Sequence, residues 1–226
     1  MKKVARQLLV FLLAFGLIFS TRAHLVQAAT TLYFPYNADY APAVNPSPAA
    51  GWTVTTGYTR FPLLLTKPSE SITAGTTRDL TEDVTNYYEL DRQFVSPPLA
   101  EGIVFATTDT IRAAIMGREF VTSDDVKGVP ISVRILDSAG TTVRATLLAT
   151  ADYGFGTELL YTGPRNVTVV ASHTLQANYT TVAGDILVVE LGGSTLTDNS
   201  NTTPQYALYY GGGASSVCAF NIETGT

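Results

Sequence analysis

Two adjacent runs that alternate apolar and polar residues constrain the fold of this chain most strongly. They occupy Ser132–Ala149, and a small Ser-Ala-Gly turn joins them. A period of two places one set of side chains on each face of an extended strand, so the stretch predicts a β-hairpin with one buried face. The apolar face is expected to comprise Ile131, Val133 and Ile135 on the first strand and Val143, Ala145 and Leu147 on the second. The polar face, directed toward water or a neighbour, comprises Ser132, Arg134, Thr142 and Arg144.

Strand signals continue along the chain, and no long helical period interrupts them. Residues 67–91 are polar and are expected to form a loop with a short strand. The spacing predicts an all-β, antiparallel two-sheet sandwich of about ten strands, and the long early loops favour a jelly-roll-like topology. Strand-like segments are Thr30–Tyr36, Trp52–Thr66, Arg92–Leu99, Gly102–Phe120, Pro130–Leu136, Thr142–Ala149, Arg165–Ser172, His173–Thr180, Ala183–Gly193 and Pro204–Gly212.

The first residues are typical of a secretory signal peptide. A basic start is followed by Leu8–Ser20, an apolar run of 13 residues, and then by small residues. The run is shorter than the ~20 residues that a membrane span needs, so we expect export without a remaining span. Cleavage is expected after Ala28, with Ala23 as the alternative. The predicted organisation is a signal peptide over residues 1–28 and a single β-sandwich domain over 29–226.

Charge argues against nucleic-acid binding. The whole chain has 14 basic and 19 acidic residues, and four of the basic residues lie in the predicted leader, so the mature chain carries a net charge of −9. An acidic surface repels phosphate backbones. The single cysteine, Cys218, cannot form an intramolecular disulfide, and we expect it to be a buried small side chain, with an intermolecular bridge as the alternative.

The C-terminal segment "VCAFNIETGT" ends on small polar residues shortly after a strand-like stretch. Three explanations are open: a short last strand, a truncated C-terminus, or an edge left open for a partner. An open sheet edge can accept a strand from another chain, which makes self-association a candidate interaction.

Four segments carry a resemblance to a known family: Thr31–Trp52, Leu90–Gly102, Val133–Ala149 and Ala183–Gly192. Their order and their amino-acid sequences resemble those of a poorly characterised family of jelly-roll-like proteins from tailed phages and environmental bacteria. The members of that family are usually hypothetical or virion-associated proteins. The resemblance covers most of residues 31–210 and implies a jelly-roll fold and a surface or structural role. The chain departs from that family by its signal peptide and by the lack of a final polar-aromatic strand, which favours an exported bacterial relative.

Histidine chemistry is scarce in this chain. The mature part retains only His173, next to Ser172 in a strand-like stretch, and no Gly-x-Ser-x-Gly motif occurs. One histidine and one cysteine cannot supply a zinc site. The acidic stretches Thr81–Asn86 and Ser123–Gly128 resemble no spaced calcium loop, so no cofactor is expected and structural calcium is the only metal considered.

Carboxylates and tyrosines supply the remaining candidate site. Glycoside hydrolases need two carboxylates in a cleft, and flat aromatic rings stack on sugar faces. Further carboxylate candidates are Glu82, Asp83, Glu101 and Glu190. The residues selected as candidate ligand-binding residues are Tyr87, Tyr88, Glu89, Asp91, Tyr209 and Tyr210.

These features predict a non-enzymatic, exported structural or adhesive β-sandwich module, associated with a cell surface, a matrix or a particle. The first alternative is a carbohydrate-binding module that recognises a surface glycan, and the second is a glycan hydrolase. The ligand and the oligomeric state do not follow from the sequence.

Overall fold

Fifteen β-strands make up the regular structure of the described residues in the computed structural model. The structure describes residues 30–35, 42–55, 57–65, 73–74, 78–79, 88–120, 126–153, 159, 165–195, 205–210 and 219–223. Ten strands have four or more residues: β1 (Thr30–Tyr33), β2 (Thr59–Pro62), β5 (Tyr88–Val95), β7 (Thr110–Glu119), β9 (Ile131–Leu136), β10 (Val143–Ala151), β11 (Arg165–Thr174), β13 (Ile186–Thr195), β14 (Gln205–Tyr210) and β15 (Ala219–Glu223). Five are shorter: β3 (Thr73–Ala74), β4 (Arg78–Asp79), β6 (Val104–Phe105), β8 (Val126–Gly128) and β12 (Tyr179–Thr180). The predicted all-β sandwich of about ten strands is confirmed.

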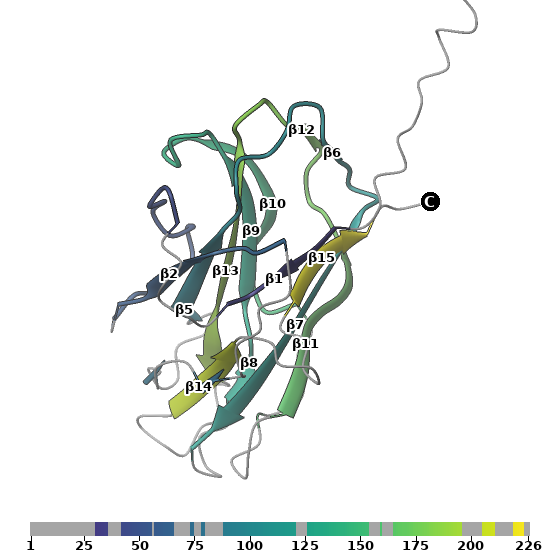
Figure 1. Ribbon diagram of the computed structural model, residues 1–226. Helices are drawn as coiled ribbons and strands as arrows, with labels where there is room; N and C mark the ends of the chain where they lie inside the picture. Colours follow the sequence, from purple (N-terminus) through teal and green to yellow (C-terminus); the bar gives the residue numbers. More distant parts are fainter. Residues whose placement is uncertain are drawn as a thin grey trace, which may run out of the picture.

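The strand order is that of a jelly roll. One sheet contains the order β1, β15, β7, β11, and the other contains β5, β13, β9, β10, with β2 beyond β5. All neighbours within these two series are antiparallel, whereas β2 pairs with β5 in parallel. Among these eight main strands, leaving out β2 and the short strands, the chain crosses between the sheets after β1, β5, β7, β10, β11 and β13, as in a jelly roll of eight strands. Figure 1 shows β6 and β12 at one end of this sandwich and β14 at the other.

Two strands share the last position of the jelly roll. β15 pairs with Thr110–Ala114 of β7, and β14 pairs with the stretch from Met116 to Glu119 on the same side, because β11 occupies the opposite side. β15 also pairs with β1, so it lies inside the sheet and is not an open edge. Of the three explanations left open for the C-terminal segment, the open edge is therefore wrong. The segment is strand-like, as predicted, and Cys218 lies outside the described residues.

The β9–β10 hairpin follows the prediction on its first strand and departs from it on the second. Ile131, Val133 and Ile135 are fully buried in the main core. Irregularities of register divide β10, so Leu147 and Leu148 are both buried while Val143 is 47% exposed. A bulge inserts one residue and shifts the inward face, which strict alternation cannot predict.

Aromatic side chains join the two sheets inside the main core. The ring of Phe94 on β5 lies 4.5 Å from that of Phe34 and 5.5 Å from that of Tyr210 on β14. Phe34 in turn lies 6.4 Å from Phe220 on β15. These four rings are fully buried, and tilted contacts at such distances add to the free energy gained from burial alone.

The hairpin turn is closed by Asp137. Its Oδ1 accepts hydrogen bonds from the backbone N–H groups of Thr141 and Thr142, at 2.9 Å and 3.1 Å. The backbone N–H of Gly140, which has a φ of +71°, donates to the Asp137 carbonyl oxygen at 2.9 Å. Glycine adopts this left-handed conformation without the strain that a Cβ would add. Backbone donation from Thr141, followed by that from Thr142, lowers the pKa of Asp137 from 3.8 to about 2.

We therefore expect the Asp137 carboxyl group to titrate at about 2 in the folded protein, measured by carboxyl carbon NMR shifts. A lowered folded-state pKa contributes stability that is present above the ordinary value of 3.8 and is lost as the pH falls toward 2. The variant Asp137→Asn removes this titration and its share of the acid dependence. A carboxyl group that titrates at its ordinary value would show that the turn hydrogen bonds do not form.

Candidate functional site

The selected acidic residues do not form a surface site. Glu89, Asp91 and Tyr210 are fully buried, because β5 begins at Tyr88 and runs through a stretch that we predicted to be mostly loop. The Glu89 Oε1 accepts hydrogen bonds from the backbone N–H and the hydroxyl of Thr55, both at 2.9 Å. The fold therefore encloses the Glu89 carboxylate and bonds it to residue 55, rather than presenting it at the surface.

Asp91 and Tyr210 do come together, but inside the sandwich. The Tyr210 hydroxyl donates to Asp91 Oδ2 at 2.7 Å, and burial together with the Asp91 charge raises the pKa of Tyr210 well above its ordinary value. The guanidinium carbon of Arg92 lies 4.2 Å from the centre of the Tyr210 ring and 4.4 Å from that of Phe61. This arrangement links β5 to β14 across the core, which is a structural role.

Two of the remaining selected tyrosines are half-buried, and the third lies outside the described residues. Tyr88 is half-buried and meets Trp52 edge-on, with ring centres 6.5 Å apart. Tyr209 is also half-buried, and Tyr87 lies outside the described residues. Every tyrosine, tryptophan and phenylalanine among the described residues is buried or half-buried. Each aromatic side chain in the part of the chain that the structure describes is thus at least partly covered by the fold.

His173 is also placed by packing. Its ring lies 4.3 Å from that of Tyr153. Within the described ranges no group of three or more His, Cys, Asp or Glu side chains could hold a metal ion. The acidic stretch Thr81–Asn86 and most of Ser123–Gly128 lie outside those ranges.

Glu190 on β13 is the centre of a buried polar cluster. The carboxylate is completely buried between β5 and β9, on the sheet face that points away from the aromatic core. It accepts hydrogen bonds from the backbone N–H of Ala49 (3.1 Å), Trp52 Nε1 (3.2 Å), Gln93 Nε2 (2.8 Å), Arg134 Nη2 (2.9 Å) and the hydroxyl of Ser132. We call these five donor groups, together with the Glu190 carboxylate, the Glu190 cluster.

The Glu190 cluster holds residues 42–55, the covering segment, across the outer face of the sheet. Arg134 Nη2 donates to the Ser47 carbonyl at 2.8 Å, and the Thr150 hydroxyl donates to the Ala50 carbonyl at 2.8 Å. At the far end the Thr53 N–H donates to the Tyr88 carbonyl at 2.7 Å. The segment thus reaches from β10 to β5.

The prediction that Ser132 and Arg134 face water or a neighbour is wrong. Ser132 is fully buried and Arg134 is 6% exposed, because the chain's own covering segment lies over them. Thr142 and Arg144, beyond its reach, are exposed as expected.

Gly192 lets the covering segment approach the sheet. A Cβ atom at this position would lie 1.9 Å from the Glu89 carbonyl oxygen and 2.6 Å from the indole of Trp52. Both distances are below any real Cβ contact, so only glycine permits this packing. The Trp52 N–H consequently reaches the Glu190 carboxylate.

The sequence signal for the Glu190 cluster was a lone charge in the apolar run "ILVVELGG". A buried carboxylate requires donors, since an unpaired charge in a protein interior is very unfavourable. The donors come from residues 49, 52, 93, 132 and 134, which are too far apart in the chain for a local motif to reveal them.

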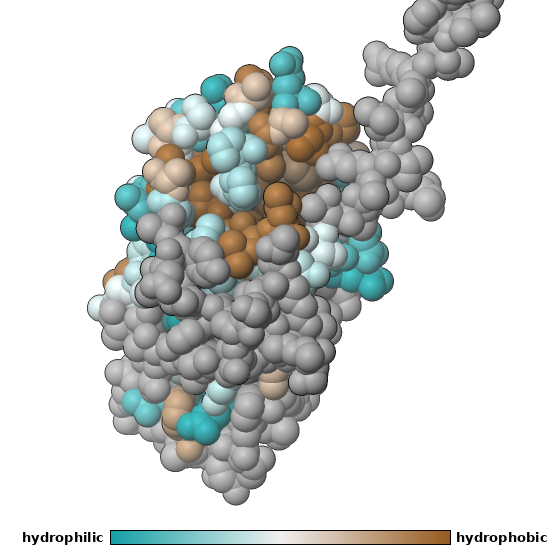
Figure 2. Space-filling model, viewed as in Figure 1, coloured by the Kyte–Doolittle hydropathy of each residue, from teal (hydrophilic) through white to brown (hydrophobic). Residues whose placement is uncertain are grey.

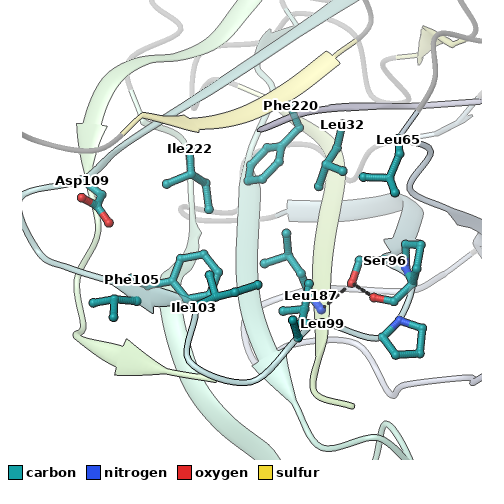
Figure 3. Close-up of a pocket in the computed structure, with 14 residues that line it drawn as sticks. Leu32, Leu65, Ser96, Leu99, Ile103, Phe105, Asp109, Leu187, Phe220 and Ile222 are labelled. Atoms are coloured by element: carbon teal, nitrogen blue, oxygen red, sulfur yellow. Dashed lines mark hydrogen bonds between the residues drawn. The ribbon is translucent and has the colours of Figure 1, made fainter. Parts of the chain in front are cut away.

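An apolar pocket of about 220 Å³ opens at the β6 end of the sandwich. Figure 3 shows Leu32, Phe220 and Ile222 on one wall and Phe105, Ile103, Leu99 and Leu187 on the other, with Asp109 and Ser96 toward opposite ends. In Figure 2, hydrophobic surface gathers in the same half of the molecule as β6 and β15. The sequence patterns did not indicate this pocket, because its walls come from five separate parts of the chain.

The wall formed by residues 96–105 is fixed by main-chain hydrogen bonds. The N–H of Leu99 donates to the Asp185 carbonyl at 2.7 Å, and the N–H of Gly102 donates to that of Thr181 at 2.9 Å. The Ser96 hydroxyl donates to the Pro97 carbonyl at 2.7 Å and accepts from the Leu187 N–H at 2.9 Å. These hydrogen bonds therefore fix one wall of the pocket.

Comparison with known proteins adds no functional assignment. No family model matches the chain, and no curated protein matches it. Two structures of a CocE/NonD family hydrolase from Staphylococcus aureus share 11% and 12% sequence identity with it, at TM-scores of 0.41 and 0.38. The likeness covers 88% and 86% of this chain but 36% of the hydrolase chain in each case, so the present chain spans little more than a third of that protein. A likeness this distant gives no information about the activity of this chain.

No helix within the described residues is long and apolar enough to cross a membrane.

We expect Glu190→Gln to lower the free energy of unfolding by about 3 kcal/mol, because the substitution leaves Arg134 buried without its counter-charge. Urea denaturation of the purified protein measures this. The matched control is Glu223→Gln, which removes an exposed ion pair to Arg112 at 3.4 Å and should cost less than about 1 kcal/mol. Equal losses in the two variants would contradict the structural role of the Glu190 cluster.

Proposed function

We propose that this chain is an exported, non-enzymatic β-sandwich module with a structural or adhesive role at a cell surface, in a matrix or on a particle. One observation carries the proposal: the fold engages three of the candidate carboxylates, whereas Glu101 is exposed and Glu82 and Asp83 lie outside the described residues. Glu190 accepts hydrogen bonds from five groups, Glu89 is bonded to Thr55, and Asp91 is bonded to Tyr210. All three carboxylates are fully buried.

The resemblance to jelly-roll-like proteins of phages and environmental bacteria supports the same role. The leader-like N-terminus supports export, with the protein secreted or retained at the cell surface. The candidate partners are a surface glycan or a second copy of the chain that adds to an open sheet edge. Among the described strands, β10 is an edge strand of one sheet and β11 is an edge strand of the other. β11 is ten residues long.

The first test concerns catalysis. We expect the exported protein to release no product from a panel of polysaccharides, and we expect Glu89→Gln and Asp91→Asn to lower the unfolding temperature. The reason is that both carboxylates bond to neighbouring elements of the fold. Polysaccharide turnover that these variants abolish while the protein stays folded would overturn the non-enzymatic assignment.

The second test concerns partners. Because β10 and β11 end their sheets among the described strands, we expect sedimentation velocity to detect a growing share of dimers or larger assemblies as the concentration of the exported protein rises. A protein that stays monomeric and also binds nothing on a glycan array, with and without calcium, would exclude both candidate partners.

A further inference from the structure

The apolar pocket is larger than the voids that ordinary packing leaves. Protein interiors rarely contain voids bigger than a water molecule, whereas this pocket has a volume of about 220 Å³. An engineered apolar cavity of about 150 Å³ binds benzene, so by proportion this pocket accommodates about nine heavy atoms. We propose that it binds the uncharged aliphatic chain of a small molecule, a site that the structural or adhesive role does not require.

The lining selects for aliphatic groups. Twelve of the 14 lining residues are apolar, and the two polar ones are Ser96 and Asp109. Ser96 uses its hydroxyl both as donor, to Pro97, and as acceptor, from Leu187. A sugar placed here would lose water from several hydroxyls and gain few hydrogen bonds, which is unfavourable by a few kcal/mol for each group.

Charge selects against acidic ligands. Asp109 is 5% exposed at one end of the pocket, and its Oδ2 accepts the backbone N–H of Ala106 at 2.8 Å. The 14 lining residues include no cation that could offset a ligand carboxylate, and burying a charge without a partner is very unfavourable. The predicted leader also contains four basic and no acidic residues, so its removal makes the protein more acidic. A fatty acid is therefore a poor occupant and a neutral chain a good one.

The rim is open to such a ligand. Leu65 is 62% exposed and Val104 is 56% exposed, and both line the pocket. Apolar rim side chains exposed to this degree gain burial when an aliphatic chain enters, at ~25 cal/mol for each Å² removed from water. Main-chain hydrogen bonds hold the wall of residues 96–105 to β13 and to the turn that precedes it.

The test compares two probes of the same chain length, 1-octanol and octanoate, in titrations of the exported protein followed by backbone amide NMR. We expect saturable shifts with 1-octanol at Leu32, Leu187 and Phe220, and at least tenfold weaker binding of octanoate. No saturable shift up to the solubility limit of 1-octanol would overturn the site. Equal binding of the two probes would overturn the preference for uncharged chains.

A matched pair of variants locates the binding. Val104→Trp partly fills the pocket from its rim. The control, Val143→Trp, introduces the same ring on β10, at a valine that is 47% exposed and does not line the pocket. Both positions are exposed, so folding is retained. We expect Val104→Trp to weaken 1-octanol binding at least tenfold and Val143→Trp to leave it unchanged. Unchanged binding in Val104→Trp, or the same loss in both variants, would overturn the assignment to this pocket.

Discussion

A negative charge enclosed inside the protein sets the main structural requirement of this fold. The Glu190 carboxylate is completely buried, so donors must surround it, and Ala49, Trp52, Gln93, Ser132 and Arg134 supply them. These groups come from the covering segment and from two strands next to β13. The same carboxylate therefore stabilises the order of the sheet and attaches the chain that lies over it.

The covering segment also explains why one sheet is buried on both faces. The inner face packs against the aromatic core, and the outer face carries a small apolar cluster against which Val44 packs. An antiparallel sheet commonly leaves its outer face to solvent. Here that face is occupied over β5, β9 and β13, while an apolar opening is retained at the β6 end, where the two sheets separate around the pocket.

Local sequence patterns predicted the burial of side chains where burial follows from strand alternation. They failed where burial depends on contacts between residues that are far apart in the chain. The buried face of Ile131, Val133 and Ile135 was predictable, because it follows from alternation alone. Val143 was not, because bulges in β10 shift the inward face. Among the candidate site residues, Glu89, Asp91 and Tyr210 were selected for their chemistry. Their burial depends on which strands pair with one another, and a local sequence pattern does not reveal strand pairing. The pocket was missed for the same reason.

The pairing of β1 with β15 has a kinetic consequence. Thr30 lies opposite Ile222, so this ladder joins residues from the two ends of the described chain. Closing so long a loop is entropically unfavourable, and sheets built from such distant pairs fold slowly. One wall of the pocket, which includes Leu32 and Phe220, exists only after that ladder forms. A ligand site at this wall therefore depends on strand pairing between the two ends of the described chain, which closes a long loop.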